Sequence, residues 1–284
     1  MKSVLVTGSY GQLAACIKDI ANQYPKYSFI FTDLPELDIT NKEEVLTFFK
    51  NNNVSWCINC AAYTNVDKAE SEKQISYQVN ETGPNNLAQP CNEYKVKLIH
   101  ISTDFVFDGK IAIPYSENDK TKPISVYGDS KLKGEKAITS ILDNYFIIRT
   151  SWLYSEHGNN FMKTMLKLSK ERDEINIVSN QIGTPTYGGD LAKVILEIVN
   201  TKSNQYGIYH YSNEGVASWF DFAKSIFKLS AVEIKVNPIP AKDYPTPAER
   251  PQFSVLDKTK IKQILDIKIP HWEESLNRAI INLK

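Results

Sequence analysis

The beginning of the chain constrains the fold more than any other stretch. The apolar run Val4-Leu5-Val6 leads directly into Gly8-Ser-Tyr-Gly11-Gln-Leu-Ala14, and an amphipathic segment follows to about residue 23. A strand, a tight glycine turn and a helix in this order are typical of a dinucleotide-binding fold, in which N–H groups at the helix start hold a pyrophosphate. Ala14 stands where a third glycine is common, but it is small enough for close helix packing. The segment therefore predicts a nucleotide site that includes Gly8 and Gly11.

A second predicted strand, over residues 28–32, ends at Asp33. Asp33 follows Gly11 by 22 residues, a distance at which a carboxylate can bind the hydroxyl groups of the adenosine ribose. Asp33 could instead be an ordinary surface residue. The glycine turn and the carboxylate, however, occur at the spacing that a dinucleotide site requires, which favours the ribose-binding role. Because Asp33 would repel a 2′-phosphate and no arginine lies beside it, the sequence favours NADH, while NADPH stays open.

The segment after Asp33 extends the predicted site. Asp38 and Ile39 would lie under the adenine, although a plain turn explains them nearly as well. Thr40 and Glu43 have the spacing of a capping box, which predicts a helix over residues 41–52.

A third strand is predicted over residues 55–62. It ends in Ala61 and Ala62, whose small side chains would let the ribose and the nicotinamide lie close. The helical stretch over residues 80–94 that follows contains Pro90, which should kink or end it.

The clearest candidates for catalytic residues lie between residues 96 and 131. An apolar strand predicted over residues 96–102 places Thr103 and Asp104 at its carboxyl end, the edge of an open α/β sheet where ligands bind. Tyr127 and Lys131 are four residues apart, so a helix that begins near Tyr127 would place both side chains on one face. The ammonium would then favour the phenolate and lower the pKa of Tyr127 toward that of a working general acid.

These three side chains together predict the reduction of a carbonyl group. Tyr127 could give a proton to the carbonyl oxygen as a hydride reaches the carbon, and the Thr103 hydroxyl could donate to the same oxygen. Taken alone, the spacing of Tyr127 and Lys131 is explained more simply by two side chains on a solvent-exposed helix face. Thr103 could be a turn or helix cap. Their context in the predicted sheet favours the catalytic interpretation.

The second half of the chain offers candidates for substrate binding. A strand predicted over residues 145–150 leads to Trp152 at the same sheet edge, where an indole could cover a sugar ring or could belong to the core. Residues 158–163 open a helix whose amino end could meet a diphosphate. Arg250, in a proline-rich loop over residues 238–251, is a candidate for the negative charge of the substrate. Further elements are a strand near 175–179, a helix over about 190–199, a strand over 207–212 and a helix capped by Ser218.

Length, composition and charge narrow the class of protein to be expected. A chain of 284 residues that is 42% hydrophobic can bury one large or two modest domains. A net charge of +0 gives no reason to expect nucleic acid or an anionic membrane as a partner. The chain enters a strand at once and no apolar run approaches the ~20 residues of a membrane helix, so a cytoplasmic location is expected.

The four cysteines fit a reducing compartment. Cys57 and Cys60 superficially match a redox or metal pair. In a strand, however, residues three apart face opposite sides, so ordinary core packing is expected and no metal site is predicted.

Seven motifs in order resemble those of the extended short-chain dehydrogenases/reductases, and most closely the dTDP-4-dehydrorhamnose reductase family. These motifs are Gly8-x-x-Gly11-Gln-Leu, Ala61-Ala-Tyr-Thr-x-Val-Asp-Lys-Ala-Glu-Ser-Glu72, Ser102-Thr-Asp-Phe-Val-Phe-Asp-Gly109, Val126-Tyr-Gly-x-Ser-Lys131, Arg149-Thr-Ser-Trp152, Asn160-Phe-x-Lys-Thr-Met-Leu166 and Pro245-Thr-Pro-Ala-x-Arg-Pro251. The resemblance spans essentially the whole chain.

Pattern and resemblance agree on the expected fold. They imply an α/β protein, with a Rossmann-type doubly wound parallel sheet and a smaller C-terminal α+β substrate-binding lobe. The NAD(P)-binding domain is expected over residues 1–150 with parts of about 174–212. The nucleotide-sugar lobe is expected over about 151–173 and 213–284.

The resemblance also implies an activity: NADPH- or NADH-dependent reduction of the 4-keto group of a dTDP-linked 6-deoxy sugar, dTDP-4-dehydrorhamnose, to dTDP-L-rhamnose. Tyr127 would donate the proton, Lys131 would bind the nicotinamide ribose, and Thr103 would hold the keto oxygen. The expected cofactor contacts are Gly8, Gly11, Gln12, Leu13, Asp33, Asp38, Ile39, Ala61, Ala62, Tyr63, Tyr127 and Lys131. The expected substrate contacts are Thr103, Asp104, Tyr127, Trp152, Asn160 and Arg250.

Other functions and one departure from the family stay open. A regulatory subunit of methionine adenosyltransferase looks similar and acts through a partner enzyme, and a sister reductase or epimerase would use another nucleotide sugar. Some family members form dimers bridged by magnesium on glutamates, and Cys16 stands at one such position. We therefore expect no metal, and either a monomer or a homodimer.

Overall fold

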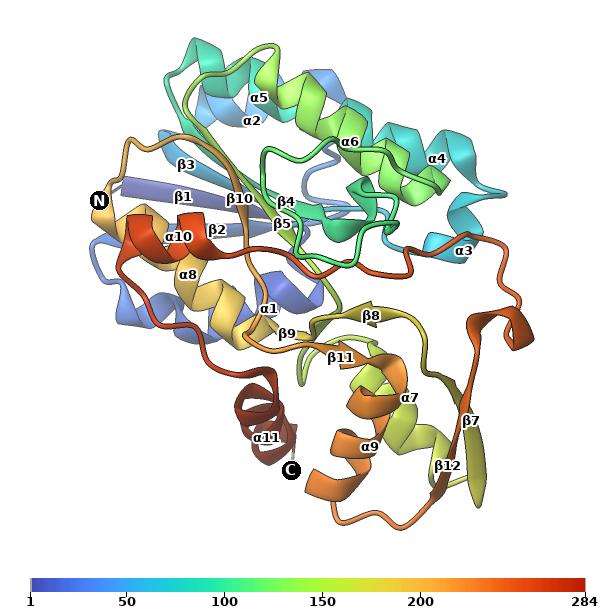
Figure 1. The fold of residues 1–284 in the computed structure, drawn as a ribbon. Helices are drawn as coiled ribbons and strands as arrows, with labels where there is room; N and C mark the ends of the chain where they lie inside the picture. Colours follow the sequence, from blue (N-terminus) through green and yellow to red (C-terminus); the bar gives the residue numbers. More distant parts are fainter. Residues whose placement is uncertain (1, 284) are drawn as a thin grey trace.

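A computed structural model describes residues 2–283 of the chain. Its larger lobe is built on a six-stranded sheet with the order β10-β5-β4-β3-β1-β2, in which every pairing is parallel (Figure 1). The strands are β1 (Lys2–Thr7), β2 (Tyr27–Thr32), β3 (Val54–Asn59), β4 (Lys97–Thr103), β5 (Tyr145–Thr150) and β10 (Gly207–His210). The strand order reverses between β1 and β3, so the carboxyl edge there is the switch point at which open α/β sheets bind ligands. The predicted Rossmann-type sheet is confirmed.

Helices cover both faces of this sheet because side chains alternate along its buried strands. Val4 and Val6 of β1 pack in a core with α1 (Gln12–Ile20) and α8 (Gly188–Thr201). Leu5, between them in sequence, packs in a second core on the opposite face. That face is covered by α2 (Lys42–Asn51), α5 (Gly83–Glu93) and α6 (Val126–Thr139) (Figure 1).

A smaller lobe lies below the sheet in Figure 1. It packs α7 (Phe161–Leu168), α9 (Trp219–Leu229) and α11 (Trp272–Leu283) around a core that includes the fully buried Phe222. Strands β7 (Glu174–Val178) and β12 (Lys235–Ile239) form a separate parallel pair at its edge. Within 174–212, β7 thus belongs to this pair, whereas α8 and β10 belong to the central sheet and its covering layer.

Short elements complete the chain. They are α3 (Val66–Ala69), α4 (Lys73–Tyr77), β6 (Leu153–Tyr154), β8 (Ile182–Gly183), β9 (Thr186–Tyr187), β11 (Ala217–Ser218) and α10 (Thr259–Leu265), with a π-helical turn at Gln78–Thr82. None of the helices within residues 2–283 is both long enough and apolar enough to cross a membrane.

The helix ends test the capping predictions. Ser218 caps α9 in a capping box with Asp221, as expected. The predicted capping box of α2 is wrong, because Asn41 caps this helix by accepting from the N–H groups of Glu43 and Glu44. The Thr40 hydroxyl instead donates to Asp38, 2.8 Å away.

Two predictions about single residues are also decided. Pro90 does not end helix α5, which continues to Glu93, because the packing of buried residues such as Leu87 and Cys91 outweighs the single helical hydrogen bond that a proline removes. Cys57 and Cys60 pack against the cores on opposite faces of the sheet, as the strand period requires. They are free thiols, so the pair is core packing.

Candidate active site

The turn between β1 and α1 fits a bound pyrophosphate. Gly8 has φ +69°, and a Cβ atom there would lie 2.6 Å from the backbone N and Cα of Ala61. Only glycine therefore lets this turn approach the end of β3 so closely. The Gly11 N–H donates to the Gly8 carbonyl at 3.0 Å, and no side chain caps α1. The N–H groups of its first turn thus need another acceptor, such as a phosphate.

Residues predicted to bind the adenosine lie around this turn. Asp33 directly follows β2 and accepts from the N–H groups of Tyr10 and Leu34, each at 2.9 Å. Ile39 is buried against Gly83 of α5, so its side chain belongs to the core, and its contact with the adenine stays a prediction.

The nicotinamide end of the predicted site is held by an asparagine in the π-helical turn. Asn80 accepts from the Tyr63 N–H and donates to the Tyr63 carbonyl, both at 2.9 Å. It also donates to the Ser130 hydroxyl on α6 at 3.0 Å. The segment that begins with Ala61 and Ala62 is therefore tied to the helix that carries Tyr127.

Helix α6 brings Tyr127 to Thr103, two of the predicted catalytic residues. Ser125 caps it by accepting from the Gly128 N–H at 3.2 Å, so the helix begins just before Tyr127, as predicted. A Cβ at Gly128 would lie 2.3 Å from the Phe105 carbonyl oxygen, so glycine lets the first turn of α6 touch the chain after β4. The Tyr127 ring lies edge-on to Phe105, and its hydroxyl is within hydrogen-bonding reach of Thr103.

The electrostatics of this group correct one prediction. Burial raises the pKa of Tyr127 to about 12, which outweighs the lowering by the Thr103 hydroxyl. The Lys131 ammonium donates to the Ile101 carbonyl at 2.6 Å, and burial lowers its pKa to about 8. The prediction that Lys131 brings the pKa of Tyr127 below its ordinary value is wrong for this structure. The phenol is protonated at neutral pH, which is the form that a proton donor needs.

Asp104 adds a buried carboxyl group beside Thr103. Burial raises its pKa to about 6, although hydrogen bonds from Ser254 and Thr103 oppose the shift. The Thr103 hydroxyl lies 3.1 Å from Asp104 Oδ1. Both residues thus lie at the carboxyl end of β4 as predicted, next to Tyr127.

The predicted substrate residues have additional structural partners. Trp152 stacks on Trp219 with ring centroids 3.6 Å apart, so it is part of the aromatic core of the smaller lobe. Asn160 caps α7, and its amide lies 3.4 Å from Gln12 Oε1, which joins the α7 start to the cofactor turn. Arg250 pairs with Asp67 at 2.7 Å, which balances the charge predicted to meet the substrate. Their contacts with substrate stay predictions.

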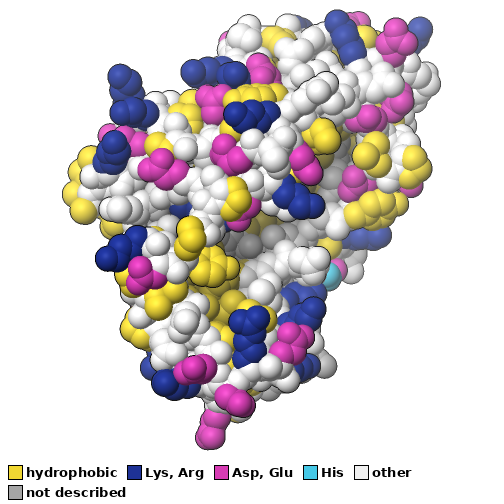
Figure 2. Space-filling view, turned by 90° about the vertical axis from the view of Figure 1, so that its right-hand side faces the viewer, with side chains coloured by type: hydrophobic (Ala, Val, Ile, Leu, Met, Phe, Trp, Pro, Cys, Tyr) yellow, Lys and Arg dark blue, Asp and Glu magenta, His cyan; other side chains and the backbone are white. Residues whose placement is uncertain are grey.

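The surface of the molecule has a hollow at the carboxyl edge of the sheet. Strand β1 runs from left to right in Figure 1, so the view from the right in Figure 2 looks onto the carboxyl edge of the sheet. Figure 2 shows the surface hollowed between the upper and lower parts of the molecule, with hydrophobic side chains along part of the wall.

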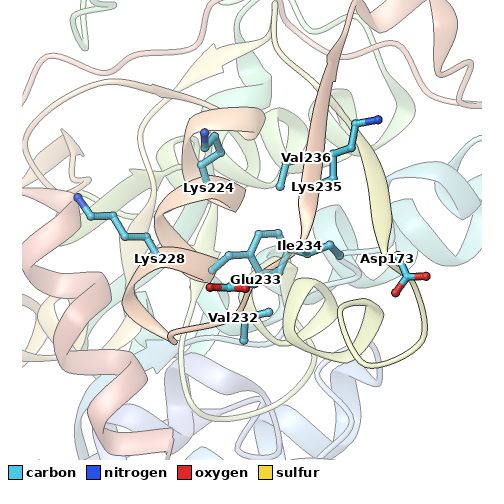
Figure 3. A pocket seen from close by; sticks show the side chains of 9 residues that line it. Asp173, Lys224, Lys228, Val232, Glu233, Ile234, Lys235 and Val236 are labelled. Carbon is cyan, nitrogen blue, oxygen red and sulfur yellow. The ribbon is translucent and has the colours of Figure 1, made fainter.

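A second hollow, of about 610 Å³, lies in the smaller lobe between α9 and β12 (Figure 3). In Figure 3 the charged ends of Lys228, Lys235 and Asp173 point outward from its centre. It contains none of the predicted site residues, and Asp173, Lys224, Phe227, Lys228 and residues 232–236 line it. We therefore place the chemistry at the sheet edge and not in this hollow.

Within residues 2–283, one group of side chains has the spacing of metal ligands. Asp19, Glu156 and His157 place one ligand atom each within 4.8 Å of one another. Two of the three side chains form a pair, since His157 Nε2 lies 2.6 Å from Asp19 Oδ2.

Sequence reasoning missed a buried polar group next to the predicted catalytic residues, one helical turn beyond Lys131. Glu135 accepts from the Arg149 side chain at 2.7 and 2.9 Å and from the Ser102 hydroxyl at 2.5 Å. The available signal was the spacing, because Glu135 follows Lys131 by one helical turn, just as Lys131 follows Tyr127.

A phenol, an ammonium and a hydroxyl beside a dinucleotide turn are what carbonyl reduction with a nicotinamide requires. The class that this fold and this site define is the short-chain dehydrogenases/reductases. The family profile described as "RmlD substrate binding domain" matches residues 1–284. The chain belongs to the dTDP-4-dehydrorhamnose reductase family.

Individual relatives agree with this family assignment. A dTDP-4-dehydrorhamnose reductase of Aggregatibacter actinomycetemcomitans is 42% identical over 287 residues, which cover 97% of each chain. The crystal structure of dTDP-4-dehydrorhamnose reductase from Bacillus anthracis in complex with NADP is 40% identical, with a TM-score of 0.96 over 99% of this chain and 100% of that one. A Thermus thermophilus UDP-glucose 4-epimerase in complex with NAD, 18% identical with a TM-score of 0.84 over 99% and 98% of the two chains, shares the fold alone.

Proposed function

We propose that the protein reduces the 4-keto group of dTDP-4-dehydrorhamnose to give dTDP-L-rhamnose, with NADPH or NADH as the hydride donor. The observation that carries this proposal is the group at the carboxyl end of β4, where Tyr127 is within reach of the Thr103 hydroxyl and Lys131 donates to the Ile101 carbonyl. The family and its relatives support the substrate. We also infer a cytoplasmic protein, present as a monomer or homodimer.

Thr103, Tyr127 and Lys131 each have a separate role in the proposed reaction. A bound dihydronicotinamide supplies the hydride to C4 of the sugar. The Thr103 hydroxyl orients the keto oxygen, and Tyr127, protonated at neutral pH, gives its phenolic proton to the oxygen as the C4–O bond gains alkoxide character. The Lys131 ammonium, close to the resulting phenolate on the same helix face, stabilises the negative charge.

Turnover of a panel of keto sugars tests the substrate. We expect oxidation of NADPH or NADH to require the dTDP-linked 4-dehydro-6-deoxy sugar and to give one reduced sugar per cofactor. Preferential reduction of a UDP- or CDP-linked keto sugar would instead assign a sister reductase. Interconversion of two sugars without net cofactor oxidation would assign an epimerase.

The pH dependence of kcat/KM should follow the protonation of Lys131. Because its pKa is about 8, the ammonium form is lost as the pH rises through that value. We expect kcat/KM to be constant below about pH 8 and then to fall about tenfold per unit. Lys131→Arg should be slower but should lack this decline, since a guanidinium stays charged. A wild-type profile that is flat to about pH 10 would contradict this role of the ammonium.

The choice of cofactor depends on the Asp33 carboxylate. We expect Asp33→Asn to raise the ratio of kcat/KM for NADPH over that for NADH by about tenfold, equivalent to about 1.4 kcal/mol, because repulsion of a 2′-phosphate is removed. Steady-state kinetics with each cofactor measure the ratio. Glu36→Gln, at an exposed acid three residues further on, should change this ratio by less than about twofold. An equal effect of both changes would show that Asp33 acts only through net surface charge.

A further inference from the structure

The ion pair between Glu135 and Arg149 is sealed inside the protein. Each side chain is 3% exposed. Arg149 Nε and Nη2 donate to the two carboxylate oxygens at 2.9 and 2.7 Å, and the Ser102 hydroxyl donates to Oε1 at 2.5 Å. Ser102 and Arg149 are direct neighbours across β4 and β5. One carboxylate of α6 therefore binds the ends of two adjacent strands.

Three successive residues of β4 each hold a different side chain of α6. The Ile101 carbonyl accepts from Lys131, the Ser102 hydroxyl donates to Glu135, and the Thr103 hydroxyl lies within reach of Tyr127. The contacts of Lys131 and Tyr127 involve groups that must also serve the reaction. Glu135 is the member of the series whose contacts are entirely internal, so it can set the position of the helix on the strand.

The groups that face Lys131 differ in charge. They come from three elements: Glu135 on α6, Cys60 after β3 and His100 on β4. Burial raises the pKa of the Cys60 thiol and lowers the pKa of His100, so both are neutral at pH 7. Glu135 thus supplies the negative charge, which raises the pKa of Lys131 and partly offsets the effect of burial.

We propose that Glu135 is a positioning residue of the reductase: it fixes α6 on the ends of β4 and β5 and keeps Lys131 in its charged form beside Tyr127. The inference rests on the proposed function for its catalytic consequence, but the charge on Lys131 can be measured without turnover. Arg149 and Ser102 act through Glu135: Arg149 holds its carboxylate in place with two hydrogen bonds, and Ser102, the residue before Thr103, ties the same carboxylate to β4.

The test removes the carboxylate without leaving a buried charge unpaired. The variant is the double change Glu135→Gln and Arg149→Gln, and the conservative companion is Glu135→Asp, which keeps the charge. The double change Asp190→Asn and Arg278→Gln is the matched control, because it removes an ion pair of 2.7 Å in which Asp190 is 4% exposed, away from Lys131. Circular dichroism checks that each variant is folded.

Two readouts separate positioning from stability. In protein labelled at lysine Cε, the nuclear magnetic resonance signal of Lys131, assigned by its loss in Lys131→Met, should titrate about one pH unit lower in the Glu135/Arg149 double variant. Its kcat should fall about 10²-fold, since displaced reacting groups lose their alignment. Glu135→Asp should restore the titration, and the Asp190/Arg278 control should match the wild type in both.

Each outcome decides the inference. A folded Glu135/Arg149 variant with the wild-type titration of Lys131 and unchanged kcat would overturn it. If that variant does not fold, Ser102→Ala replaces it, because this change leaves the ion pair intact; a tenfold or larger loss of kcat would support the inference and an unchanged kcat would overturn it. If the wild type reduces no keto sugar, the proposed function fails, while the Lys131 titration still tests the electrostatic part.

Discussion

Replacing Tyr127 by phenylalanine should lower kcat by about 10²–10⁴-fold, the range that a positioned proton donor contributes. The phenol is protonated at neutral pH because burial raises its pKa to about 12, and it lies beside the Thr103 hydroxyl at the end of β4. Phenylalanine keeps the ring that packs against Phe105, so the fold and cofactor binding should survive. Steady-state kinetics and a cofactor titration would separate the two effects.

Tyr77→Phe is the matched control. Tyr77 is also half-buried, and its hydroxyl donates to Asp129 on the same helix α6 at 2.6 Å. Its loss should change kcat by only a few-fold, because this hydroxyl contacts the helix and not the reacting group. If Tyr127→Phe kept more than about a tenth of the wild-type kcat, Tyr127 would not be the proton donor.

The largest expected loss of stability comes from Arg149→Met, which leaves the Glu135 carboxylate buried without its partner. Removing one member of a buried ion pair costs about 3–5 kcal/mol of the free energy of unfolding. Both side chains are 3% exposed, so water cannot compensate. Urea denaturation followed by circular dichroism would measure the change through the midpoint and slope of the transition.

Two further variants test whether this loss of stability comes from the unpaired buried charge. Glu135→Gln combined with Arg149→Met should recover most of the loss, since no charge is then left unpaired. Lys235→Met, which breaks the exposed pair with Glu174, should cost less than about 1 kcal/mol. A loss from Arg149→Met as small as that from Lys235→Met would show that the buried pair does not stabilise the fold.

The sheet and the Tyr127 helix were predictable because their signals are local. A β-strand buried on both faces is rich in apolar residues, as Val4 to Val6 are throughout and as residues 96–102 are apart from Lys97, His100 and Ser102. The left-handed backbone of Gly8 requires glycine, so the turn can be recognised in the sequence. The four-residue spacing of Tyr127 and Lys131 needs only that the intervening chain be helical.

The failed predictions depend on contacts that local patterns do not encode. The choice of Asn41 over Thr40 as the α2 cap is settled by which side chain reaches the N–H groups, and Thr40 is already bonded to Asp38. The pKa of Tyr127 depends on how deeply the assembled site buries the phenol, which two charges in a sequence cannot reveal.

The missed residues require tertiary structure for a similar reason. Glu135 and Arg149 lie 14 residues apart in the chain and meet only because α6 packs across the ends of β4 and β5. Likewise, β7 reads as an ordinary strand in sequence, and its pairing with β12 instead of the central sheet follows from a partner near residue 235.

Transfer of a labelled hydride tests the central claim most directly. The protein would be incubated with the dTDP-linked keto sugar and with NADPH or NADH carrying deuterium at the transferred C4 position, and the product examined by nuclear magnetic resonance. We expect one deuterium at C4 of the reduced sugar and, in Tyr127→Phe, the same product formed far more slowly. A wild-type protein that binds the cofactor and the sugar but gives no deuterium at C4 would contradict the assignment of this site as a 4-ketoreductase.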